Sequence, residues 1–325
     1  MSTTTKLLGF VVVVVAVLAA AVGVGKLVGP VDAPEAADHE SMDEGHEETG
    51  EAHGMSSDEA ASTAVDVPKG LMVSQNGYTL ELGRTDAPAG SAVPIEFTIV
   101  GPDGEPVTDY DVEHEKELHL IAVRRDFSGF QHVHPVMDAE GTWRTDLDLA
   151  AGEWRVFADF KASGADALTL GHDLAVAGSY RPERSTESTT SQVGRYTVTL
   201  EGDLTAGTDA ELTLSVTLDG EPVTDLEPYL GAYGHLVALR AGDLAYLHVH
   251  PEGTPDDGTT EPGPDVVFYA QVPSAGRYHL YLDFKHRGVV RTAAFTVTGT
   301  STSEPVDSEE PEESDESEEP HSEGH

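Results

Sequence analysis

The chain contains no cysteine in 325 residues, and this absence limits both its folding and its chemistry. Without disulfides the protein must rely on hydrophobic cores alone. Thiolate metal sites are excluded for the same reason, and with them blue-copper chemistry, which needs a cysteine ligand. Any metal ion bound by this chain must therefore be held by His, Asp, Glu or Met side chains.

Positive charge and catalytic motifs are also scarce. The sequence has 18 Lys and Arg residues against 59 Asp and Glu, which gives a formal net charge of −41. This balance argues against nucleic acid and anionic membrane surfaces as partners. The sequence has no nucleophile elbow, Walker loop, dinucleotide fingerprint or His-Glu-x-x-His motif. We therefore expect a protein that is not an enzyme.

Residues 7–25 form a long run without charge, between Lys6 and Lys26. A run of this length can span a bilayer, with residues 1–6 as its flank. The alanines at 19–21 are of the type that a signal peptidase accepts, so a cleaved secretory signal is the alternative. We expect a transmembrane helix that anchors the protein in the cell membrane by a single pass, with extracytoplasmic domains. The alternative is a secreted protein.

Two acidic segments lack aromatic residues and apolar periodicity. They are residues 26–69, a linker with three histidines and two methionines, and residues 299–325, a tail. Their apolar content cannot offset the entropy of ordering the chain, so we expect both to be disordered. The histidines and methionines of the linker also suggest that it collects metal ions.

The region between these segments is an internal repeat. Three motifs occur twice in the same order, which indicates one duplicated domain of about 100 residues. The pairs are DGEPVTD at 103–109 and 219–225, GYTLEL at 77–82 with RYTVTL at 195–200, and AAGEWRVFADFK at 150–161 with SAGRYHLYLDFK at 274–285.

Both copies have the pattern of β-strands. Segments of about five to nine residues are rich in Val, Ile, Thr, Tyr and Phe, and Gly, Pro, Asp or Ser separates them. Strands at 8–12-residue spacing predict an all-β fold of two tandem immunoglobulin-like β-sandwich domains. We place the domains at 70–178 and 193–298, joined by the polar linker 179–192.

Each repeat also contains the same histidine pattern, one histidine in an apolar run followed thirteen residues later by His-x-His-Pro. The six histidines are His119, His132, His134, His235, His248 and His250. Three imidazoles at the same spacing in two copies predict a metal site in each repeat. The alternative is that these histidines are structural, with each ring bonded to backbone groups.

Hairpin geometry predicts how the three rings meet. In the second copy, Gly242-Asp243 suits a two-residue type II′ turn, so residues whose numbers sum to 485 stand opposite each other. His235 then faces His250, and His248 lies on the same sheet face because side chains alternate.

The first copy has a poorer turn sequence but the same loop length, so His119 should face His134 with His132 diagonal. We expect the second copy to show this arrangement more clearly.

An all-imidazole site suits a copper ion, with a zinc ion as the alternative. Ligating imidazoles usually donate their other N–H to a carboxylate or carbonyl, and Asp159 and Asp283 of the repeated DFK motif are the candidates. The histidines without a counterpart in the other copy are expected to be surface or incidental residues. They are His114, His172, His279 and His286.

The SQNGYTLEL segment (74–82) and the GHLVALRAGDLAYLHVHP hairpin (234–251) resemble a group of actinobacterial exported, membrane-anchored proteins with two HxHP repeats. Such proteins are commonly labelled secreted or heavy-metal-associated. The resemblance implies an extracytoplasmic protein that handles copper or another heavy metal, with His235, His248 and His250 as ligands.

Two functions are therefore open. The first is copper or zinc buffering or delivery through a three-histidine site in each repeat, with a metal transporter or other surface protein as partner. The alternative is a non-catalytic cell-surface interaction module whose histidines are structural.

Overall fold

The computed structural model describes residues 67–247 and 249–301, which belong to one compact unit spanning residues 64–325. The predictions for the flank, the membrane segment, nearly all of the acidic linker and most of the tail lie outside the described residues, as does His248. Within the described part of the chain, no helix is long and apolar enough to cross a membrane.

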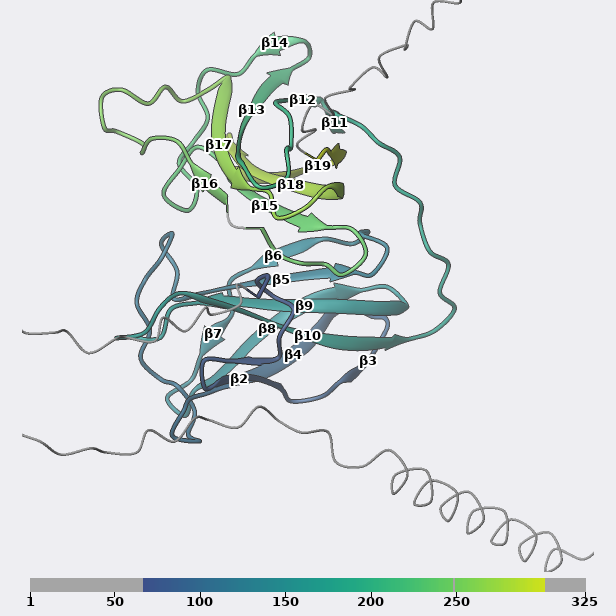
Figure 1. Cartoon of the computed structure of the whole chain (residues 1–325), viewed down its shortest axis with the longest axis vertical. Helices are drawn as coiled ribbons and strands as arrows, with labels where there is room; N and C mark the ends of the chain where they lie inside the picture. The colour runs from purple at the N-terminus through teal and green to yellow at the C-terminus, as the bar shows by residue number, and fades with distance from the viewer. Residues whose placement is uncertain (1–66, 248, 302–325) are drawn as a thin grey trace, which may run out of the picture. The chain divides into compact units, whose positions relative to one another are not determined.

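The first repeat folds into two five-stranded sheets (Figure 1). One has the order β1 (Ser74–Gln75), β2 (Tyr78–Leu82), β4 (Gly90–Val100), β8 (Thr142–Leu149), β7 (Val136–Met137). The other has the order β3 (Asp86–Pro88), β10 (Leu168–Ala177), β9 (Gly152–Phe160), β5 (Leu118–Arg124), β6 (Gln131–Val133).

The second repeat also forms two sheets. One has the order β11 (Thr190–Val193), β12 (Tyr196–Glu201), β13 (Asp209–Leu218), β17 (Asp265–Gln271), β16 (Val249–Pro251), with β14 (Glu221–Pro222) paired to β13. The other has the order β15 (His235–Arg240), β18 (Gly276–His286), β19 (Val289–Gly299). In both repeats the strand order is that of an immunoglobulin-like sandwich, so the all-β prediction is confirmed in the described residues.

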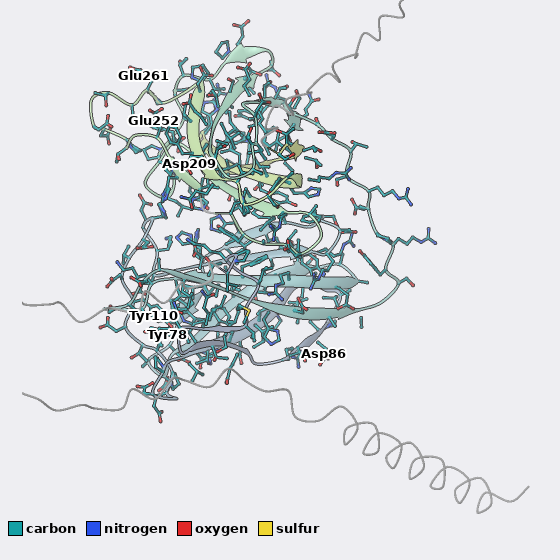
Figure 2. The ribbon with its side chains drawn as sticks, viewed as in Figure 1. Tyr78, Asp86, Tyr110, Asp209, Glu252 and Glu261 are labelled. Atoms are coloured by element: carbon teal, nitrogen blue, oxygen red, sulfur yellow. The ribbon has the colours of Figure 1, made fainter. Side chains whose placement is uncertain are left out.

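Alternating side chains build a separate core in each sandwich. In β4, for example, Val93, Ile95, Phe97 and Ile99 are buried while the residues between them are exposed or half-buried. Aromatic rings contribute to the first core, where Tyr110 packs edge-on against Trp143 and Phe160. Tyr110 is labelled in Figure 2, among the side chains of the first repeat. Each repeat thus buries its own hydrophobic cluster.

β5 is buried along its whole length, unlike the other strands of the first repeat. One face belongs to the core of its own sandwich. The other face contributes to a third cluster that joins the two repeats, and its buried members are Ile121, Val123, Phe157, Val237, Leu239, Leu244 and Tyr281. This cluster holds β5 of the first repeat and β15 of the second together, and both strands carry the lone histidine of their repeat at or near one end.

The predicted hairpin register is confirmed in the first copy. Leu120 pairs with Val133 and Ile121 with His132, which is the register that sets His119 opposite His134. Since side chains alternate along a strand, His119, His132 and His134 share one face of the sheet.

The prediction for the second copy is only partly right. Leu239 bridges Tyr246, as the sum of 485 requires. However, Arg240 N–H donates to Ala245 O and Leu244 N–H to Arg240 O, so residues 241–244 form a longer loop in place of a two-residue turn. Beyond Leu247 the chain crosses to the opposite sheet, where β16 pairs with β17. The prediction that His250 faces His235 is therefore wrong.

Candidate functional site

His119 lies on β5, where it is paired in register with Asp159 of β9. Its side chain is buried, and Nε2 lies 3.1 Å from the carbonyl oxygen of Glu113. Burial, followed by the charge of neighbouring His132, lowers the pKa of His119 to about 3. The ring is therefore a neutral imidazole at physiological pH, which is the form that binds metal ions.

The first-copy histidines form a compact group that we call the three-histidine cluster: His119, His132 and His134. One ring nitrogen from each lies within 4.8 Å of the other two. The ring centroids are 5.0 to 5.3 Å apart. The closest approach joins His119 Nδ1 and His132 Nε2 at 3.1 Å. The β5–β6 register creates this group, because it places all three side chains on one face.

Each end of this contact is fixed by a hydrogen-bond acceptor. The backbone carbonyl of Glu113 faces His119 Nε2, and a carboxylate oxygen of Asp283 lies 2.9 Å from His132 Nδ1. Three contacts thus follow one another: Glu113 carbonyl to His119, His119 to His132, and His132 to the Asp283 carboxylate. If each is a hydrogen bond between these groups, three hydrogens are needed. Two neutral imidazoles carry only two. With both outer N–H groups donating outward, His119 Nδ1 and His132 Nε2 turn lone pairs toward each other, and a cation between them resolves the conflict.

His134 adds a third unsatisfied nitrogen. Its Nε2 atom is buried and has no hydrogen-bond partner among the described residues. Burial, then the charges of His132 and Lys116, lowers the pKa of His134 to about 4. A buried nitrogen without a partner is rare in folded proteins and often marks a missing water or ion.

Two further histidines lie beside the cluster. His235, from β15 of the second repeat, stacks on His119 with ring centroids 5.6 Å apart and an interplanar angle of 9°, and its ring is 4.9 Å from that of His132. Burial and then neighbouring His132 lower the pKa of His235 well below its usual value. The ring centroid of His114 lies 5.6 Å from that of His235 and 6.2 Å from that of His119. His114 is exposed, as expected for a surface histidine, but without a repeat counterpart nothing in the sequence indicates that it lies beside the cluster.

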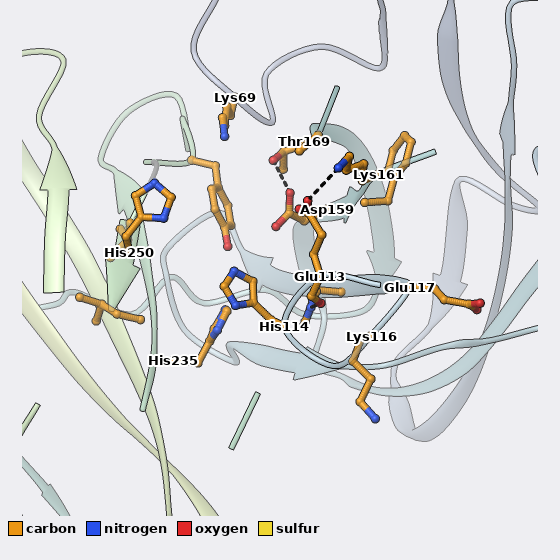
Figure 3. Close-up of a pocket in the computed structure, with 16 residues that line it drawn as sticks. Lys69, Glu113, His114, Lys116, Glu117, Asp159, Lys161, Thr169, His235 and His250 are labelled. Carbon is orange, nitrogen blue, oxygen red and sulfur yellow. Dashed lines mark hydrogen bonds and ion pairs between the residues drawn. The ribbon is translucent and has the colours of Figure 1, made fainter. Parts of the chain in front are cut away.

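The second-copy histidines do not form a matching group in the described residues. His250 lines a cavity of about 110 Å³ together with His114, His235 and Asp159 (Figure 3). Asp159 accepts a hydrogen bond from Thr169, and burial raises the pKa of its carboxyl group. The structure thus brings His235 to the first-copy cluster and leaves His250 at the edge of this cavity.

Two other sequence interpretations are corrected. His279 and His286 were expected at the surface, but both are buried. The ring of His279 stacks on Phe127 of the first repeat and bonds to Thr296. His286 lies between the Tyr196 hydroxyl and Asp225. Both rings fill hydrogen-bonded structural positions.

Three imidazoles, two of them with fixed outer partners, are a suitable donor set for Cu²⁺, Zn²⁺ or Ni²⁺. The ligand atoms available on the first two rings are His119 Nδ1 and His132 Nε2, because Glu113 and Asp283 hold their other nitrogens. The third ligand is a ring nitrogen of His134, whose Nε2 has no partner among the described residues. This arrangement of ligands with an outer carbonyl or carboxylate is usual at protein metal sites.

Comparison with solved structures finds low similarity. The adhesin FdeC of Escherichia coli is 17% identical, with 70% of this chain and 65% of that chain covered and a TM-score of 0.23. The adhesin InvE of Yersinia pseudotuberculosis is 11% identical, with 70% of this chain and 59% of that chain covered and a TM-score of 0.21. A putative membrane anchored protein from Corynebacterium diphtheriae is 9% identical, with 70% of this chain and 59% of that chain covered and a TM-score of 0.21. The chain thus spans about two thirds or less of these proteins, and TM-scores of this size carry no argument about function.

No curated protein sequence matches this chain. One domain family does match, twice, at residues 73–178 and 191–301, which are the two copies recognised from the repeated motifs. These matches cover more than half of the sequence. The chain therefore belongs to the family described as a domain of unknown function (DUF8832) and contains two copies of that domain.

Proposed function

We propose that the protein binds a transition-metal ion, copper or zinc, at the three-histidine cluster. One observation carries the proposal: the three-histidine cluster brings together ring nitrogens that the surrounding hydrogen bonds leave unsatisfied. His119 Nδ1 and His132 Nε2 face each other while their other nitrogens are directed at acceptors, and His134 Nε2 has no partner among the described residues. A bound cation satisfies all three nitrogens at once.

An extra proton is the competing way to satisfy the cluster. Burial and neighbouring His132 disfavour that proton on His119, whose pKa is lowered to about 3, so the proton would have to sit on His132, beside the Asp283 carboxylate. A proton between two rings also leaves His134 Nε2 without a partner. A metal ion bound by all three rings has neither difficulty, which supports metal binding.

We place this activity outside the cytoplasm, on a protein anchored in the cell membrane through residues 7–25. The uncharged run in the sequence and the acidic, cysteine-free chain support that location. The role is buffering copper or zinc, or delivering it to a metal transporter or another surface protein. The linker histidines and methionines would feed the site. A three-imidazole site favours Cu²⁺ over Zn²⁺ in affinity.

The test is a titration of the full chain with Zn²⁺ and Cu²⁺ by isothermal calorimetry. The tails also carry histidines, so the informative quantity is the difference between variants. The double variant His132→Ala and His134→Ala should lose one tight equivalent of metal. The control variant His172→Ala changes a half-buried histidine that lies outside the cluster and is bonded to the neighbouring Asp173 carbonyl, and it should keep that equivalent. Equal stoichiometry and affinity in both variants would overturn the proposal.

A second function, an interaction module with structural histidines, is favoured by the protein contacts of His119 and His132. Under that function metal would not raise the melting temperature. Histidine-to-alanine changes would then destabilise the fold by about 1–3 kcal/mol each, because buried polar groups would lose their partners. The same titration, followed by thermal unfolding with and without Zn²⁺, separates the two functions.

A further inference from the structure

The hydrogen bond that orients His132 comes from the other repeat. His132 Nδ1 lies 2.9 Å from Asp283 Oδ2, across 151 residues of sequence. The two side chains are 1% and 4% exposed, so solvent does not weaken the contact. The first repeat therefore supplies the ring, and the second supplies the group that fixes its tautomer.

Asp283 is itself held firmly within the second repeat. It lies on β18, is paired in register with His235 of β15, and its other oxygen accepts a hydrogen bond from the Thr292 hydroxyl. A carboxylate anchored on a central strand cannot follow His132 if the repeats separate. Its position is fixed by the second sandwich.

His235 adds a second contribution from that repeat. The residue is half-buried, and its ring stacks on His119 and lies 4.9 Å from that of His132 between centroids. It covers the cluster with an imidazole, which excludes water from that side and lowers the local polarity around the ligand nitrogens.

We infer that the metal site is shared between the two repeats: His119, His132 and His134 of the first repeat hold the ion, and Asp283 of the second is the residue that positions them. This inference rests on the proposed metal binding. It adds that affinity depends on docking of the repeats. By thermodynamic reciprocity, a metal ion that binds the docked arrangement more tightly also stabilises it by the same factor.

The duplication supplies a matched control. Asp159 occupies the position in the first repeat that Asp283 occupies in the second, and both lie two residues before the lysine of DFK. Asp159 accepts its hydrogen bond from Thr169, as Asp283 does from Thr292. Among the described residues, Asp283 is hydrogen-bonded to a ring of the three-histidine cluster and Asp159 is not. The same substitution at the two sites therefore separates positioning of the ligand from loss of a buried carboxylate.

The experiment measures the Kd of the full chain for Zn²⁺ by competition with a chelator. Asp283→Asn keeps the side-chain size but removes the charge, and outer partners of this kind are worth about 10- to 100-fold in metal affinity. We expect a loss of about that size in Asp283→Asn and a clearly smaller loss in Asp159→Asn, because Asp159 is the cross-strand neighbour of His119 but makes no hydrogen bond to a ring of the cluster within the described part of the chain. In a His132→Ala background, Asp283→Asn should cause no further loss, because its effect acts through that ring.

A second measurement reports on docking. The chain has no native cysteine, so spin labels can be attached at Glu81→Cys and Glu211→Cys, which are exposed positions on the first and second repeats. Zn²⁺ should narrow the distance distribution between the labels in the otherwise wild-type chain and not in Asp283→Asn. If Asp283→Asn fails to fold, Thr292→Val, which removes the hydroxyl that holds Asp283, replaces it in both measurements.

The outcomes are separable. A wild-type chain that does not bind Zn²⁺ refutes the proposed function. A wild-type chain that binds Zn²⁺, with equal losses in the two Asp→Asn variants or a loss that persists without His132, refutes the shared site.

Discussion

Acidification from pH 7 to pH 5 should weaken zinc binding by the three-histidine cluster far less than it weakens binding by ordinary histidines. The perturbation tests competition between protons and metal for the same ring nitrogens. The pKa values of His119 and His134 are lowered to about 3 and about 4 by burial. A lowered pKa means that the ring stays neutral as the pH falls. Protons therefore compete with the metal ion for His119 and His134 only when the pH approaches the lowered pKa values of these two rings.

The magnitude follows from these two values. A histidine with the usual pKa of about 6.5 is only about 3% neutral at pH 5, and each such ligand costs about 25-fold in affinity between pH 7 and pH 5. His119 and His134 should cost almost nothing over that range. Relative to a flexible peptide with three histidines, the protein should therefore keep about 600-fold more of its pH 7 affinity.

The assay is a chelator competition for Zn²⁺ at pH 7, 6 and 5, with the peptide measured in parallel. The double variant His132→Ala and His134→Ala subtracts binding by the tails. Affinity of the protein that falls in parallel with that of the peptide would refute the reasoning, because it would mean that the rings are hydrated and not buried. Affinity that falls far less than that of the peptide down to pH 5, and then drops steeply near pH 4, would support it.

Three other substitutions test separate parts of the structure. His134→Leu should abolish tight zinc binding yet leave the metal-free protein as stable or more stable, since it removes a buried unpaired nitrogen that costs about 1–3 kcal/mol; a clear loss of metal-free stability in urea would favour structural histidines. Leu280→Ala, in the centre of the second core, should lower the free energy of unfolding by about 2–5 kcal/mol, and a smaller change in urea would show that the site collapses easily. Gly171→Ala should lower the melting temperature, because its Cβ would lie 2.1 Å from the Gly70 carbonyl oxygen; an unchanged melting temperature would mean that the 70–72 segment moves aside freely.

Much of the fold could be predicted from local sequence patterns. The strands and the two sandwiches follow from period-two alternation and turn residues, as in β4. The register of β5 and β6 follows from loop length alone, and it correctly grouped His119, His132 and His134. These features depend on residues close together in the chain, where geometry leaves few choices.

The prediction for the second copy was wrong because the same histidine spacing is compatible with two different paths of the backbone. After the hairpin contact of Leu239 with Tyr246, the chain crosses to the opposite sheet before His250. In the first copy the pairing continues through His132 to Val133. The spacing of the histidines does not show at which residue the chain leaves one sheet and joins the other.

The contact between repeats was also out of reach of the motif argument. His132 meets Asp283 only because two outer sheet faces pack together. A signal was present in the sequence: residues 118–123 and 236–239 are almost unbroken apolar runs, and such runs are typical of strands covered on both faces. An interpretation based on alternation of apolar and polar residues treats these segments as ordinary strands with one buried face. It therefore misses that their outer face is also covered.

The cluster that joins the repeats consists largely of matching positions. Ile121 corresponds to Val237, Val123 to Leu239 and Phe157 to Tyr281, by the offsets of the repeated motifs, and all six are buried together.

Corresponding surfaces that meet in this way are the mark of a two-fold homodimer, in which one patch binds its own copy. The two repeats thus pack against each other through corresponding faces, as the subunits of such a dimer do. His119 and His235, which correspond across the duplication, stack on each other, while among the described residues a group of three rings is found in the first repeat. A single DUF8832 domain with the same apolar face would need a second copy of itself to cover that face.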